Sequence, residues 1–317
     1  MSLPEVWTYR HDEIQTGRPY AVDVDEEDWL WEGCGLDRLT GHHLGTAEVR
    51  QIPIPEMGSR PIYQVFACQR KLVLVLGEAP FYLVYDPRAG TCARHPVPAA
   101  RPIVWYGVEA GGKILLFERS ESRVLVLDGP EAAPRAVDCP FPGQLASGWT
   151  LSDGLVYCPL SEPSRLVRFD PAKERFLDEA PLPWPEATLA GHLEHGGVLY
   201  TWDTAGGRIL PHDIERRRWL DPVPSPDVGR VYGFLGGGFG FRGRALLCLS
   251  TYAHPSRLDP KTGKIILPEG PLTVDGRPPR FLERYLVFDP EAGTFEYLAA
   301  PEQPDGIPLL CYNWTDG

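Results

Sequence analysis

A unit of about 42 residues recurs along the chain, and this period restricts the possible folds more than any other feature of the sequence. Each unit ends in an apolar run, Asp-Pro or a related pair, a turn and a second short run, as in YLVYDPRAGTCARHPVP and YLVFDPEAGTFEYLAAP. The turn aspartates lie 42, 42, 43, 46 and 30 residues apart; they are Asp86, Asp128, Asp170, Asp213, Asp259 and Asp289. Proline presets the first turn position, aspartate caps the turn and glycine supplies the positive φ. Each copy therefore predicts a β-hairpin.

The first half of each unit carries another pair of apolar runs, joined by a Gly-Gly or Asp-Gly turn. Examples are IVWYGVEAGGKILLF, LASGWTLSDGLVYCP and LAGHLEHGGVLYTW. Four short strands in a unit of this length are typical of one blade of a β-propeller. A helical period is almost absent, and the 33 glycines and 34 prolines are spread along the chain. The sequence therefore predicts an all-β fold, a single β-propeller domain of four-stranded blades over residues 1–317.

The number of blades has two interpretations. Seven hairpins can be counted if the divergent copy GLDRLTGHHLGTAEVRQIPIP is included, and this favours seven blades. The short last spacing allows an alternative, in which residues 253–280 form an insertion or lid in a six-bladed ring. In both cases, we expect the N-terminal run EVWTYRHDEI and the C-terminal run IPLLCYNWTDG to pair and close the ring.

These units resemble the blades of kelch-like, gluconolactonase-like and streptogramin-lyase-like propellers, over nearly the whole chain. The resemblance rests on the blade pattern, with the Gly-Gly of kelch repeats in some units and one Trp-Asp pair at Trp202 and Asp203. It implies a fold in which the first strand of each blade lines a central channel, with ligands at its mouth. Streptogramin lyases use histidine and glutamate with a divalent ion there; no residue is carried over, because their motif does not match residue by residue.

The composition restricts the expected partners. Acidic residues outnumber basic ones 43 to 31, and the net charge of −12 argues against binding of nucleic acid or an anionic membrane. The seven cysteines include no C-x-x-C pair, so neither a disulfide framework nor a zinc knuckle is predicted. The absence of a signal peptide and of a long apolar run predicts a cytoplasmic protein. We expect a small-molecule ligand in the central channel and no cofactor, with a divalent metal left open.

The segment TLAGHLEH, residues 188–195, carries the polar residues that stand out on these inner strands. Side chains alternate along a strand, so His192 and Glu194 should face one way and His195 the other. Aligned on the turn, Glu194 matches Glu109, and two carboxylates in a partly apolar funnel would raise the pKa of one. We predict that His192, Glu194 and Glu109 are catalytic, with His192 as the base and a glutamate orienting it. The competing interpretation is that they make only structural hydrogen bonds.

Aromatic residues are predicted to line the same channel. The expected substrate-binding residues are Trp149, Trp105, Tyr106, Tyr63, Phe66, Tyr312, Trp314 and Tyr232. Aromatic faces suit a cationic substrate or intermediate. If residues 253–280 form a lid, its residues would be Tyr252, His254 and Arg257. The glycine-rich run 233–241 lacks a following helix, so it is not predicted to bind phosphate.

These features predict a small-molecule enzyme with an aromatic-lined axial pocket and non-redox acid–base chemistry, of the lyase, isomerase, cyclase or hydrolase type, with a role in biosynthesis. The alternative is a non-catalytic propeller that serves as a protein-interaction scaffold or a sugar-binding module. A repeated sugar site would need the same residues in every blade, whereas the inner runs VWYGVEA, ASGWTLS and AGHLEHG differ. The unequal inner strands favour one asymmetric site, and with it the enzyme.

Overall fold

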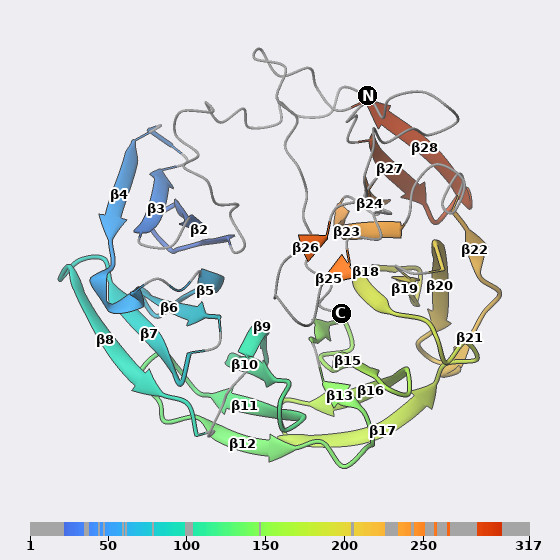
Figure 1. Cartoon of the computed structure of the whole chain (residues 1–317), viewed down its shortest axis with the longest axis horizontal. Helices are drawn as coiled ribbons and strands as arrows, with labels where there is room; N and C mark the ends of the chain where they lie inside the picture. Colours follow the sequence, from blue (N-terminus) through green and yellow to red (C-terminus); the bar gives the residue numbers. More distant parts are fainter. Residues whose placement is uncertain are drawn as a thin grey trace. The chain divides into compact units, whose positions relative to one another are not determined.

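The structure is a computed structural model (Figure 1). It describes residues 22–34, 38–43, 45–46, 48–58, 60, 62–77, 79–98, 104–145, 147–203, 206–225, 234–241, 244–250, 257–258, 265–266 and 284–299. The chain divides into two compact units: unit 1 comprises Met1–Glu162 and Leu166–Glu179, and unit 2 comprises Pro163–Arg165 and Ala180–Gly317. Within the described ranges, no helix is long and apolar enough to cross a membrane.

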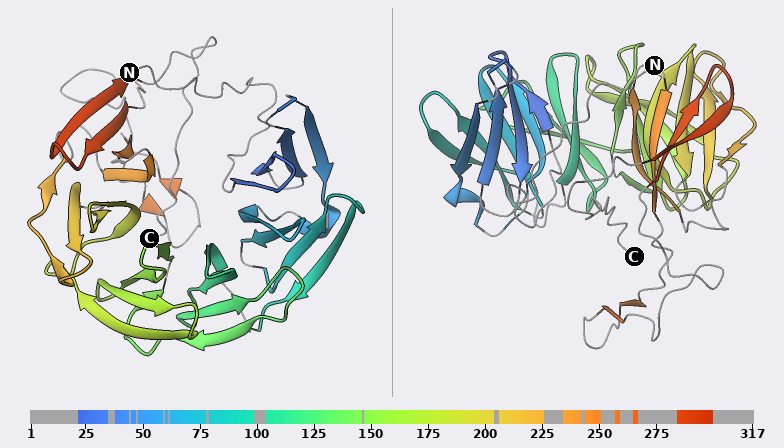
Figure 2. Two further views of the ribbon diagram at one scale, coloured as in Figure 1. Left: turned by 180° about the vertical axis from the view of Figure 1, so that it is seen from behind. Right: turned by 90° about the horizontal axis from the view of Figure 1, so that it is seen from above.

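Unit 1 contains four antiparallel sheets that follow one another in chain order (Figures 1 and 2). Sheet 1 consists of β1 (Val22–Val24), β2 (Trp29–Cys34), β3 (Arg38–His43) and β4 (Val49–Pro53), and the 3-10 helix η1 (Pro55–Met57) follows it. Sheet 2 consists of β5 (Ile62–Cys68), β6 (Lys71–Leu76), β7 (Phe81–Asp86) and β8 (Thr91–Pro96). Sheet 3 consists of β9 (Val104–Ala110), β10 (Lys113–Glu118), β11 (Arg123–Leu127) and β12 (Arg135–Asp138). Sheet 4 consists of β13 (Gln144–Leu145), β14 (Trp149–Thr150), β15 (Val156–Ser161), β16 (Arg165–Asp170) and β17 (Arg175–Pro181), of which Arg165, Ala180 and Pro181 belong to unit 2.

Unit 2 contains two further antiparallel sheets and a small hairpin. Sheet 5 consists of β18 (Leu189–His195), β19 (Val198–Asp203), β20 (Arg208–Asp213), β21 (Arg218–Trp219) and β22 (Val223–Pro224). Sheet 6 consists of β23 (Phe234–Phe241), β24 (Arg244–Ser250), β27 (Arg284–Asp289) and β28 (Thr294–Ala299). The hairpin consists of β25 (Arg257–Leu258) and β26 (Ile265–Ile266).

Neighbouring sheets within a unit meet through their first two strands. In unit 1, β1 and β2 contact β5, β5 and β6 contact β9, and β9 contacts β14; in unit 2, β18 contacts β23 and β24. Strands then pair outward in order, so that β8 and β12 form the far edges of sheets 2 and 3. The predicted all-β architecture of four-stranded blades is confirmed.

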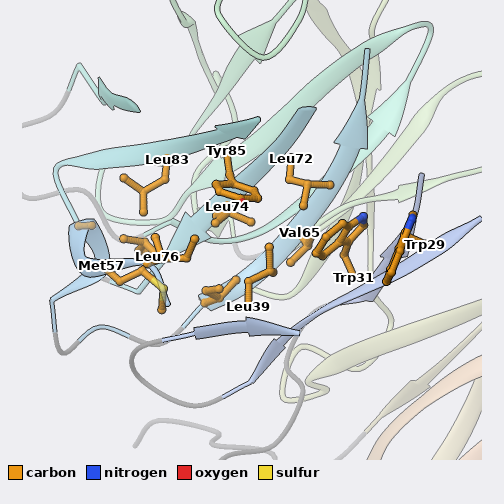
Figure 3. Packing of buried hydrophobic residues seen from close by; sticks show 13 residues of the cluster. Trp29, Trp31, Leu39, Met57, Val65, Leu72, Leu74, Leu76, Leu83 and Tyr85 are labelled. Atoms are coloured by element: carbon orange, nitrogen blue, oxygen red, sulfur yellow. The ribbon is translucent and has the colours of Figure 1, made fainter. Parts of the chain in front are cut away.

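Apolar side chains fill the space between the sheets of unit 1. One cluster joins sheet 1 to sheet 2, where Trp31 and Leu39 pack with Val65 and Leu74 (Figure 3). A second cluster joins sheets 2 and 3, and a third joins sheets 3 and 4. Val65 belongs to the first cluster and the next residue, Phe66, to the second, because successive side chains point to opposite faces of a sheet. Both faces of sheets 2 and 3 are therefore buried.

The hairpin turns that contain aspartate form as the sequence predicts. The Asp86 carboxylate accepts hydrogen bonds from the backbone N–H groups of Arg88 and Ala89, both at 3.0 Å. Asp170 and Asp289 accept the same pair of bonds in sheets 4 and 6. The fifth residue of each turn has a positive φ; these residues are Gly90 (64°), Glu174 (49°), Arg217 (54°) and Gly293 (64°). The carboxylate and the positive φ together define the turn.

The hairpin of β25 and β26 bears on the number of blades. β24 pairs directly with β27, so this hairpin lies in a segment inserted between the second and third strands of sheet 6. This placement corresponds to the alternative of an insertion over residues 253–280, and the described residues form six sheets of four or five strands. A seventh blade would have to come from residues outside the described ranges. The terminal runs 5–14 and 307–317 lie there too, so ring closure stays a prediction.

Among the turns that the structure describes, two-residue turns join the first two strands of sheets 2, 3 and 5. Both turn residues have positive φ in each, at Gly111 and Gly112, at Gly196 and Gly197, and at Gln69 and Arg70. Two positive φ values define the type I′ turn, whose twist matches that of the flanking strands. Glycine adopts this backbone without strain, whereas residues with a Cβ do not. Sheet 2 therefore carries a strained turn where sheets 3 and 5 have glycine pairs.

Replacement of Arg70 by glycine should stabilise the protein. Arg70 has φ 63° and an exposed side chain, and its backbone N–H, which donates to Glu26, is kept by glycine. Relief of the left-handed strain should outweigh the added entropy of the unfolded chain by roughly 0.5–1 kcal/mol. Urea unfolding measures this. Gly112→Arg is the mirror control: a Cβ there meets no atom within 4 Å, so the substitution should destabilise the protein through the φ of 73°. Equal unfolding midpoints for Arg70→Gly and wild type would contradict the strain.

Candidate functional site

His192 and Glu194 lie on β18, the first strand of sheet 5. In the ladder with β19, His192 is paired with Thr201 and Glu194 with Leu199. The register shifts between Ala190 and His192, so the ladder has a β-bulge at Gly191, whose φ is 55°. A bulge bends the strand and re-aims the side chain that follows it. The direction of His192 is therefore set by this irregularity in the ladder.

The two faces of sheet 5 have different neighbours. Leu193 is paired with Tyr200, and the Tyr200 ring lies 5.5 Å from the ring of Phe288 in sheet 6. His192 and Glu194 lie on the opposite face, together with the buried Thr201 and Leu199. His195 is paired with Val198 and so belongs to the face of Leu193. Sheet 5 thus separates His192 and Glu194 from His195.

Burial and charge act on His192 in opposite directions. The side chain is half-buried, and burial lowers the pKa of the imidazole below its ordinary value of 6.5, while the nearby charge of Glu194 raises it. Burial is the larger effect, because the low dielectric disfavours the imidazolium. His192 is therefore mainly neutral near pH 7, with a ring nitrogen able to accept a proton.

The titration of His192 should show both effects. We expect an imidazole pKa below 6.5 in wild type and a lower value still in Glu194→Gln, which removes the carboxylate charge. Because the unfolded chain then binds this proton more strongly, His192 should reduce folding stability as pH falls from 6.5 through its folded pKa. NMR of histidine-labelled protein measures the pKa, and loss of one signal in His192→Gln identifies it. A wild-type pKa at or above 6.5 would contradict the burial.

Glu109 lies on β9 in unit 1 and is paired with Ile114 of β10. Its side chain is exposed, yet desolvation by its surroundings raises the pKa of the carboxyl, and the charge of Asp23 raises it further. Asp23 belongs to β1, and its carboxylate accepts a hydrogen bond from the backbone N–H of Ala67 at 2.6 Å. The thiol of Cys68 also has a raised pKa, from burial first and then from the charges of Glu109, Glu26 and Asp23. The carboxylate that perturbs Glu109 in unit 1 is therefore Asp23, which the sequence analysis did not single out.

Asp23→Asn should move the Glu109 titration. The amide oxygen can still accept the bond from Ala67, but the negative charge is lost, so the Glu109 pKa should fall toward the ordinary 4.5. Carboxyl ¹³C NMR across pH 3–7 measures the shift. Glu26→Gln is the control, since Glu26 acts on Cys68 and is not among the charges acting on Glu109. An unchanged Glu109 midpoint in Asp23→Asn would show that burial alone accounts for the raised pKa.

Two of the predicted aromatic walls are packing residues in the structure. Phe66 is 4% exposed in the cluster between sheets 2 and 3, where its ring covers Gly107; a Cβ there would lie 2.8 Å from it. Trp149 is 6% exposed and is paired with Tyr157 on β15. Phe66 also lies one residue out of phase with His192, since the position equivalent to His192 in sheet 2 is Val65. Both side chains are therefore almost fully buried, and their substrate-binding role stays a prediction.

The other aromatic candidates of unit 1 lie at bulges or beside them. Tyr63 falls at the register shift of β5, where its half-buried ring lies against Gly77. Trp105 falls at the register shift of β9, and the next residue, Tyr106, is 50% exposed. Tyr106 is therefore more open to a ligand than Tyr63, and of Trp105 the backbone alone is described.

Several predicted residues lie outside the described ranges: Tyr232, Tyr252, His254, Tyr312 and Trp314. Arg257 begins β25, and its backbone alone is described. The substrate and lid roles of these residues stay predictions. Across the residues that the structure describes, no three His, Cys, Asp or Glu side chains group so that they could hold a metal ion.

The architecture defines the class of the chain as a β-propeller, and comparison with solved structures agrees. A streptogramin B lyase matches with a TM-score of 0.65 at 12% identity, over 90% of this chain and 84% of that chain. Virginiamycin B lyase from Staphylococcus aureus matches with a TM-score of 0.65 at 11% identity, over 91% and 86%. A catalytically inactive His-to-Ala variant of that lyase with quinupristin matches at 0.60 and 14%, over 90% and 95%. No family model and no curated protein matches the sequence. At these identities the likeness establishes the propeller fold.

Proposed function

We propose that the protein is an enzyme that acts on a small organic molecule by non-redox acid–base chemistry of the lyase type, with His192 as the proton acceptor. The observation that carries the proposal is the setting of His192. It is half-buried on the first strand of its sheet, directly after a bulge, and burial lowers its pKa. A general base must be unprotonated at the working pH and held in a fixed direction, and this setting favours both.

The similar propellers support the reaction class. Those proteins are streptogramin B and virginiamycin B lyases, and replacement of one histidine inactivates the latter. The unequal first strands add to this, because a sugar-binding module with repeated sites would carry the same residues in each sheet. Sheet 5 has His192 where sheets 2 and 3 have Val65 and Gly107. A single polar position among apolar equivalents is what one asymmetric site requires.

The proposed reaction is an elimination. The neutral imidazole of His192 takes a proton from carbon, the electrons of that C–H bond form a double bond, and the leaving group departs with its own bonding pair. The negative charge of Glu194, on the same face of sheet 5, stabilises the imidazolium that forms. Glu109 of unit 1 is proposed separately as a proton donor, because its raised pKa keeps the carboxyl protonated to a higher pH.

His192→Ala should lower the rate of turnover strongly, while His195→Ala should not. Loss of a general base lowers the rate by roughly 10²–10⁴-fold. His195 is the matched control, since it lies three residues away on the opposite face of the same strand. The assay follows quinupristin and, separately, a library of small metabolites by liquid chromatography and mass spectrometry. Turnover that His192→Ala leaves unchanged would contradict the assignment of the base. Absence of turnover throughout, with tight capture of one defined protein partner, would favour the scaffold.

A further inference from the structure

The residue paired with His192 differs from the residue at the equivalent position in three other sheets. Counted from the turn, the fourth residue of the second strand is Leu74 in sheet 2, Leu116 in sheet 3 and Leu247 in sheet 6. In sheet 5 the same position is Thr201, which is paired with His192. Thr201 is 0% exposed, as are Leu74 and Leu116. A hydroxyl thus takes the place of a leucine in a fully buried site.

A buried hydroxyl is unfavourable unless it makes a hydrogen bond, and Thr201 makes a specific one. Its Oγ1 donates to the carbonyl oxygen of Gly191 at 3.0 Å. Gly191 is the bulge residue that directly precedes His192, and its φ of 55° suits glycine. The peptide that links Gly191 to His192 is therefore held at its oxygen by a side chain on the neighbouring strand.

We propose that Thr201 is a positioning residue for His192: its hydroxyl bond to Gly191 fixes the bulge and so the direction of the imidazole. Sheet 6 has an irregularity at the same depth, directly before Gly238, and there Leu247 stands in place of the threonine. In sheets 2 and 3 the bulges, at Tyr63 and Trp105, lie one pair farther from the turn. Packing alone therefore permits a bulge at this depth. The added hydroxyl belongs to the sheet that presents a histidine. The inference deepens the proposed function and rests on His192 being the base.

The test compares Thr201→Val, which keeps the branched shape and removes the donor, with Thr201→Ser, which keeps the hydroxyl. The first readout is the His192 imidazole signal in NMR of the full-length histidine-labelled protein, recorded without substrate. We expect Thr201→Val to shift or broaden that signal and change its titration, and Thr201→Ser to restore both. Thr150→Val is the matched control, because Thr150 Oγ1 donates in the same way to the Glu109 carbonyl oxygen at 2.9 Å in unit 1. It should leave the His192 signal unchanged.

The second readout is kinetic. Since small misplacement of a catalytic group lowers the rate by up to about 10²-fold, kcat in Thr201→Val should fall about 10- to 100-fold with little change in KM. A His192 signal and titration in Thr201→Val that superimpose on wild type would overturn the positioning role, whatever the activity. A changed signal with restoration by serine supports it, even if His192→Ala shows the proposed reaction to be wrong. If Thr201→Val does not fold, the comparison runs between Thr201→Ser and Thr201→Ala, with serine expected to match wild type.

Discussion

Burial of both faces of a sheet, as in sheets 2 and 3, is the constraint on which the rest of the structure depends. In β6, Leu72, Leu74 and Leu76 belong to the cluster shared with sheet 1, whereas Val73 and Val75 belong to the cluster shared with sheet 3. A strand packed on both sides must be apolar wherever it is buried, and the runs LVLVL of β6 and ILLF of β10 are continuously apolar for that reason. Any polar side chain in the first two strands then needs a specific partner, because desolvation without one is unfavourable.

The sequence predicts the elements well because their signals are local. The Asp-Pro turn and the glycine pair depend on backbone conformations that a few residues determine, so the hairpins and the four-stranded unit follow from them. The face of the sheet to which each side chain of an inner strand points cannot be predicted from these local signals. Phe66 was expected in the channel but packs between sheets, since a strand apolar on both faces gives no period from which to read its direction. An alignment wrong by one residue moves a side chain to the other face.

The candidate site can be predicted from the sequence only in part. His192 and Glu194 stand out because polar residues are rare on inner strands, and the structure places both on one face of β18. Asp23 has no such signal, because it lies in a three-residue strand and reaches Ala67 of the next sheet through a contact of long sequence separation. The bulges at Tyr63, Trp105 and Gly191 likewise cannot be predicted from the sequence, since no single residue type marks them.

Glu174 is a polar residue that departs from the repeated pattern of the turns, and its role is structural. It occupies the left-handed turn position that glycine fills at Gly90, and its carboxylate binds Lys113 at 2.6 Å and Arg135 at 2.5 Å, both from sheet 3. These cations lower the pKa of Glu174 to about 2. These ion pairs join sheets 3 and 4, and they explain why a residue with a strained backbone occupies this position. The ion pair between Lys71 and Glu131 joins sheets 2 and 3 in the same way.

The hydrogen bond of Thr201 and the ion pairs of Glu174 hold different parts of the structure. The Glu174 bonds join one sheet to the next, so they serve cohesion of the fold, and neighbouring sheets repeat the arrangement. The Thr201 bond stays within sheet 5 and ends on the peptide before His192, where leucine stands in the equivalent sites of three other sheets. A stabilising role would favour the leucine, because the position is fully buried. Retention of the hydroxyl is better explained by the direction that it imposes on the histidine.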